Sequence, residues 1–274
     1  MTGEIPSTQR SSPALASAGR DAAGAWLALG VLVYALAPLA VAWSRRLPGI
    51  DPAWDFLMAL GVVATGGCAV LPLLSARWWA GLHRDPVLLR LVQRLHRQLS
   101  YVMAAFVVVH VAGILMLEPR TLDYLLPTAP GYMLAGLVAL LLLVVLVVTS
   151  QGRLKQGWPQ ASWRRWHAGF SALALAGLVW HLVGAGFWFA GAGPWLALGW
   201  LVGVPTGLSL YWRHHRTRTT TGLRVVGERV RRRRGLLTAL SLFFILASAW
   251  FAWSSSARAP RTDHPLPCPV GRCL

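Results

Sequence analysis

Four of the eight histidines form two pairs whose spacing could place cofactor ligands on one face of a helix. His96 and His110 are 14 residues apart, and so are His167 and His181. At about 3.6 residues per turn, this spacing is close to four full turns, so both members of a pair share a helix face. At about 1.5 Å per residue they stand roughly 21 Å apart along the axis, too far to bind one ion together.

The histidines bracket apolar runs that are long enough to cross a bilayer. Only 13% of the 274 residues are charged, against about 25% in a typical soluble domain. About 20 apolar residues cross a hydrocarbon core of about 30 Å. Seven runs meet this length, at roughly 23–43, 56–75, 98–117, 131–149, 168–190, 195–212 and 235–253. We therefore predict an all-α, polytopic transmembrane helix bundle of six to seven spans, with the last run deciding the number.

The basic residues predict the orientation of the bundle. If the amino terminus is cytoplasmic, 20 of the 26 Lys and Arg residues fall in cytoplasmic segments, as the positive-inside rule expects. The net charge of +17 is then explained by membrane topology, and we expect no nucleic-acid partner. The first run begins at Ala23 and is too long for a cleaved signal peptide. We predict an integral protein of a bacterial inner membrane that contacts lipid, with its amino terminus cytoplasmic.

This orientation places the histidines at two depths. Spans three and five both run from inside to outside, so His96 and His167 lie near the inner surface and His110 and His181 near the outer one. Each facing pair could supply the two axial ligands of a haem iron, and the core of a helix bundle suits a cofactor. Ionisable groups within a membrane are costly and tend to be functional. The pattern predicts two b-type haems between spans three and five. The alternative is a haem-free transporter or scaffold whose histidines relay protons or join helices.

The two helices resemble those of the ferric reductase-like transmembrane domain. That family includes ferric reductases, NADPH oxidase membrane domains and the haem-binding subunits of bacterial sulfoxide reductases. The resemblance covers about residues 55–212 and rests on the paired histidines, on Arg97 after the first of them, and on the Trp–Arg–Arg–Trp–His run that ends at His167. It implies that His96, His110, His167 and His181 are haem b ligands. Cytochrome b561-like proteins show a similar use of two histidine pairs.

Arginines cluster at the inner ends of the two histidine-bearing helices. Arg97 follows the first histidine, and Arg165 precedes His167 by two residues. A guanidinium matches the geometry of a carboxylate, so we assign both side chains to binding haem propionates. Arg94 and Arg164 lie beside them. The alternative for the whole cluster is ordinary anchoring of the helices at the cytoplasmic surface.

The remaining segments predict how the chain is divided and where its electrons come from. Residues 1–22 read as a disordered cytoplasmic tail, residues 23–254 as the haem-binding bundle, and residues 255–274 as a short carboxyl-terminal tail. Because no glycine-rich nucleotide-binding pattern follows a strand, we expect no flavin or NADPH domain. The electron donor would then be a separate flavoprotein or a quinol. The chain would be an oxidoreductase or an electron-transfer subunit, with a membrane subunit of an extracytoplasmic sulfoxide reductase as the alternative.

The carboxyl-terminal tail generates a first test of this topology. Cys268 and Cys273 are predicted to lie outside, where an oxidising compartment favours a disulfide. In protein unfolded without reductant, a maleimide should label neither thiol, and prior reduction should make both reactive. Labelling of both thiols without reduction would contradict the disulfide. Labelling only from the cytoplasmic side of intact vesicles would contradict a seventh span.

Overall fold

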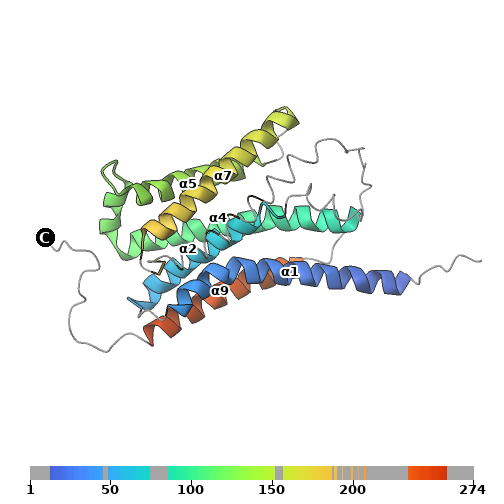
Figure 1. Cartoon of the computed structure of the whole chain (residues 1–274), viewed down its shortest axis with the longest axis horizontal. Helices are drawn as coiled ribbons and strands as arrows, with labels where there is room; N and C mark the ends of the chain where they lie inside the picture. The colour runs from blue at the N-terminus through green and yellow to red at the C-terminus, as the bar shows by residue number, and fades with distance from the viewer. Residues whose placement is uncertain are drawn as a thin grey trace, which may run out of the picture.

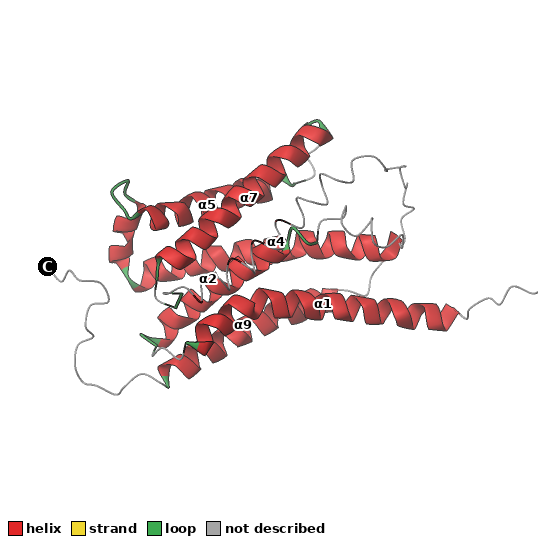
Figure 2. Ribbon diagram, viewed as in Figure 1, coloured by secondary structure: helices red, strands yellow, loops and turns green. Residues whose placement is uncertain are grey.

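The computed structural model describes residues 13–45, 49–74, 86–151, 157–186, 188–189 and 234–257, together with four single glycines between 193 and 207. Every regular element in these residues is a helix (Figures 1 and 2). The elements are α1 (Pro13–Ser44), α2 (Pro52–Val70), α4 (Pro86–Leu117), the 3-10 helix η1 (Pro119–Leu125), α5 (Gly131–Thr149), α7 (Gln160–Gly184) and α9 (Arg234–Ser256). The all-α prediction is confirmed.

Six of these helices, which match the first five predicted spans and the seventh, are long and apolar enough to cross a membrane. The sixth predicted run, 195–212, lies almost wholly outside the described residues, as does the tail that carries Cys268 and Cys273. Taken together, the described helices confirm a polytopic transmembrane bundle.

Several helices extend beyond their apolar runs. Helix α4 begins at Pro86 and α7 at Gln160, so the inner histidines lie inside helices and not at their first turns. Helix α1 begins at Pro13, within the segment that composition predicted to be disordered. Residues 13–23 contain five alanines, the best helix former, which explains why helix continues there without an apolar signal.

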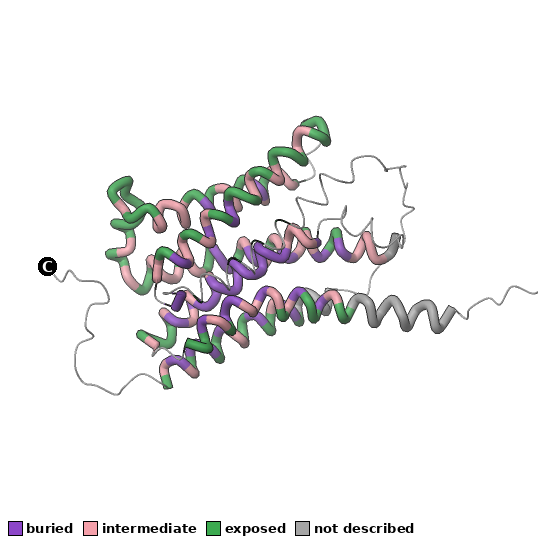
Figure 3. The backbone as a smooth tube through the Cα atoms, viewed as in Figure 1, coloured by how far each residue is buried: buried purple, intermediate pink, exposed green. Residues whose placement is uncertain are grey.

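Helix α2 is the centre of the packing. Within its apolar stretch 72% of the residues are buried, against 11–33% in the other five spans. It packs against α1, α4 and α9, while α5 packs chiefly against α7. Figure 3 shows buried residues concentrated along α2 and on the faces of its neighbours. The bundle therefore has two parts, a group around α2 and the α5–α7 hairpin.

Helix α9 closes the bundle at the amino-terminal end of α2. The backbone N–H of Gly49, just before α2, donates to the carbonyl of Ser255 at 3.0 Å. The carboxylate of Asp51 caps α2 by accepting from the N–H of Ala53 at 2.9 Å, and Asp55 is fully buried beneath this turn. Because the last turn of α9 meets the first turn of α2, the two helices are antiparallel. The seventh run therefore lies in the bundle in the direction that a span requires.

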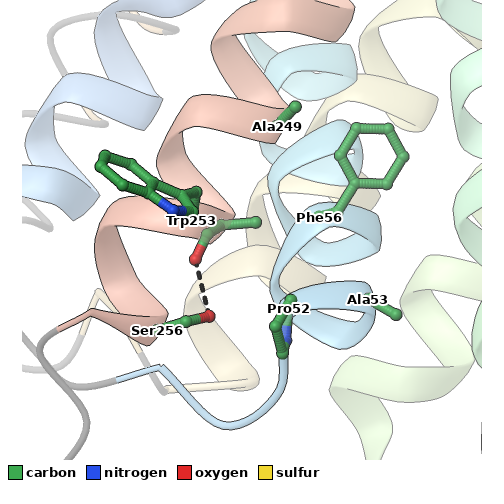
Figure 4. Close-up of a pocket in the computed structure, with 7 residues that line it drawn as sticks. Pro52, Ala53, Phe56, Ala249, Trp253 and Ser256 are labelled. Carbon is green, nitrogen blue, oxygen red and sulfur yellow. Dashed lines mark hydrogen bonds between the residues drawn. The ribbon is translucent and has the colours of Figure 1, made fainter.

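A groove of about 370 Å³ lies between the ends of α2 and α9. It is lined by Pro52, Ala53, Phe56, Ala249, Ala252, Trp253 and Ser256 (Figure 4). The hydroxyl of Ser256 donates to the carbonyl of Ala252 at 2.9 Å, so it is already used within α9. The lining is almost wholly apolar, which suits contact with a lipid chain more than recognition of a polar substrate.

Candidate functional site

The structure brings the four predicted histidines together as two facing pairs. The rings of His96 and His167, the inner pair, have centres 6.5 Å apart and planes inclined at 56°. The rings of His110 and His181, the outer pair, are also 6.5 Å apart, with planes at 72°. These are the two partnerships that span direction and depth predicted. Each pair joins one residue of α4 to one residue of α7.

The two histidine-bearing helices pack chiefly against other partners and not against each other. Helix α4 packs on α2 and α7 packs on α5. Among the described residues, α4 and α7 themselves make at most a marginal backbone contact. The four imidazoles therefore face one another across the boundary between the two parts of the bundle.

The separation of the rings matches ligation of one metal ion from opposite sides. A metal–imidazole bond is about 2.0–2.1 Å, so two such rings would have centres roughly 6–6.5 Å apart. Two imidazoles are too few for a closed zinc site, which takes four ligands, and the described residues contain no cluster of three or more His, Cys, Asp or Glu. A porphyrin supplies four nitrogens of its own and needs two axial ligands. The distance between the rings of each pair is therefore compatible with the two axial ligands of a haem iron.

Hydrogen bonds fix the outer pair in the tautomer that leaves Nε2 without a proton. The Nδ1 atom of His110 lies 2.8 Å from the carbonyl oxygen of Leu57 in α2. The Nδ1 atom of His181 lies 3.1 Å from the carbonyl oxygen of Tyr132 in α5. A carbonyl can only accept, so Nδ1 carries the proton and donates in both rings. The Nε2 lone pair is then available for a metal.

The inner pair is held by a different set of contacts. The Nδ1 atom of His96 donates to the carbonyl of Leu71, just past the end of α2, at 3.0 Å. The ring of His167 stacks on Trp163 with centres 4.8 Å apart and planes at 26°. The indole N–H of Trp163 in turn donates to the carbonyl of Thr149 at 3.2 Å. Trp163 thus ties the start of α7 to the end of α5 while it packs against a candidate ligand.

The predicted propionate-binding arginines lie beside the inner pair along the helices. Arg97 and Arg165 are both exposed, as are Arg94 and Arg164. Exposed arginines at this level suit either a carboxylate partner or the membrane surface. Their assignment to cofactor binding stays a prediction.

Sequence reasoning missed a pattern that α4 and α7 share, His-x3-Ser-x9-His-x2-Gly. The hydroxyl of Ser100 donates to the carbonyl of His96 at 2.7 Å. The hydroxyl of Ser171 donates to the carbonyl of His167 at 2.6 Å. Aligning the two helices on their histidines is the signal that would have found both serines. The match indicates that the two helices place their histidines by the same local construction.

Comparison with known proteins bears on the same helices. The family model described as "Ferric reductase like transmembrane component" matches residues 29–178, more than half of the chain. The matched segment includes His96, His110 and His167, and it ends three residues before His181. No curated protein and no solved structure matches the chain. Domains of this family generally bind haem. The chain therefore belongs to the ferric reductase-like transmembrane family, whose members are integral to the membrane and transfer electrons.

Proposed function

We propose that this chain is a di-haem b protein that carries electrons across the membrane from a cytoplasmic donor to an acceptor outside. The observation that supports it most strongly is the pair of facing imidazole couples, each with ring centres 6.5 Å apart, on the same two helices. When bound, haem iron takes up and releases single electrons. The chain contributes the ligands, their orientation and the apolar surroundings.

The two levels of histidines suit electron transfer between both surfaces of the membrane. The two levels are about 21 Å apart along the helices, in a hydrocarbon core of about 30 Å. Each pair therefore lies within a short distance of one surface, and the two pairs together bridge most of the core. This spacing suits two centres in series, the inner one reduced from the cytoplasmic side and the outer one oxidised from outside.

The hydrogen bonds on Nδ1 do more than select a tautomer. Donation from a ligand's second nitrogen to a carbonyl fixes the ring and raises the basicity of the metal-binding nitrogen. His96, His110 and His181 each make such a bond. A more basic imidazole favours the oxidised iron, so these backbone carbonyls would lower the reduction potential of both centres.

The donor and acceptor are part of the same proposal. Exposed Arg94, Arg97, Arg164 and Arg165 lie within three residues of His96 or His167 along α4 and α7. Such a surface suits an acidic flavoprotein donor because complementary charge speeds association; a quinol is the other donor that the position allows. On the outer side the acceptor would be a ferric chelate or a partner reductase.

The first test is the haem content of the purified chain. Protein made under haem-replete conditions should contain two b-type haems per chain by the pyridine haemochrome assay. The matched control replaces all four paired histidines by Ala and should contain none. A haem-free wild-type chain would contradict the proposal, and a single haem would show that one pair has only a structural role.

The second test assigns each histidine to its centre. Replacing His110 or His181 by Ala should remove the outer haem and give the same difference spectrum, because both changes destroy one site. Replacing His96 or His167 should give a second matching class. The double variant His110→Ala with His181→Ala should retain one haem, whereas His110→Ala with His167→Ala should retain none. Matching spectra for His110→Ala and His167→Ala would contradict the pairing.

A further inference from the structure

Two glycines lie directly against the rings of the outer pair. Gly61 of α2 is beside His110, and Gly136 of α5 is beside His181. A Cβ added at Gly61 would lie 3.0 Å from Nδ1 of His110, and one added at Gly136 would lie 2.7 Å from Nδ1 of His181. Both distances are shorter than ordinary van der Waals contact. A side chain at either position would therefore require the ring or the helix to shift.

Each glycine stands one turn beyond the carbonyl that its histidine uses. Leu57 precedes Gly61 by four residues, and Tyr132 precedes Gly136 by four. In an α-helix, residues four apart lie one above the other. A side chain at the glycine would therefore cover the approach to the carbonyl oxygen, whose second lone pair accepts the imidazole N–H.

A second glycine contact repeats in the same way. Gly113, three residues after His110, faces the side chain of Leu57, and Gly184, three residues after His181, faces the side chain of Tyr132. In both cases an added Cβ would collide with that side chain. The α2–α4 and α5–α7 pairs thus share four features around the outer histidines. These are the histidine, the carbonyl that faces its Nδ1 atom, the glycine against its ring and the glycine three residues after it. Such a repeat in two unlike helix pairs is hard to attribute to incidental packing.

We propose that Gly61 and Gly136 are positioning residues that seat the outer imidazoles, holding Nδ1–H on a helix carbonyl and leaving Nε2 for iron. We call each contact between one of these glycines and its imidazole a seat. The link to iron rests on the proposed function, whereas a seat is a contact within the chain. The inner pair uses Leu71 and Trp163 instead. Loss of a seat should therefore affect the outer centre alone.

The spectroscopic test compares Gly61→Ala and Gly136→Ala with Gly30→Ala in α1, where an added Cβ meets nothing within 4 Å. Each seat variant should lose the outer haem, so that haem content falls from two toward one, or should shift only that haem's spectrum and midpoint potential. Gly30→Ala should keep both haems unchanged. Unchanged spectra and potentials in the seat variants would overturn the proposal, and so would equal loss of both haems.

A stability cycle gives the seat a readout other than the haem spectrum. Gly61→Ala should lower the apparent Tm in the wild-type background and have much less effect with His110→Ala, because removal of the ring makes room for the methyl group. Such non-additivity is the signature of direct contact. The Gly136 and His181 cycle is an independent repeat, and Gly30→Ala with His110→Ala should be additive.

The outcomes separate the two proposals. Additive Tm losses in both seat cycles would overturn the seat even if the wild-type chain holds two haems. Coupled losses in a wild-type chain that binds no haem would support the ring contact and contradict the proposed function.

Discussion

An imidazole buried in a membrane has two nitrogens that both need partners, and the bundle is organised around this requirement. A buried polar group without a hydrogen bond is costly, and a membrane offers no water to supply one. The outer histidines give Nδ1–H to carbonyls of neighbouring helices, at Leu57 and Tyr132. Their Nε2 atoms are then left without a proton. Two backbone contacts thereby determine which way both rings face.

The same requirement explains the division of the bundle. Helix α4 must lie close to α2, and α7 close to α5, for each ring to reach its carbonyl. Small residues at these contacts allow the approach, as they do at many helix interfaces in membranes. Helices α4 and α7 are then free to stand apart, and α1 and α9 cover the remaining faces of α2. The separation of α4 from α7 follows from the packing of each helix against its own partner.

Sequence periodicity predicted the partnerships, but not the contacts that hold them. A spacing of 14 residues fixes both face and depth within a helix, and the basic loops give each helix its direction, so His110 could be matched to His181. The roles of Gly61 and Gly136 depend on how neighbouring helices pack, which periodicity does not encode. Helix starts such as Pro86 were also missed, because beyond the apolar run a helix leaves no hydropathy signal. The sulfoxide-reductase and transporter alternatives concern partners and chemistry that the fold alone does not separate.

The most direct test of the account is the electron paramagnetic resonance spectrum of the fully oxidised, purified protein. Ligation by two histidines makes ferric haem low-spin, so two such centres should give two low-spin signals. The account predicts that both signals are present in equal amount. A high-spin signal of comparable amount would show that one centre lacks a histidine ligand, and the absence of any haem signal would contradict the central claim.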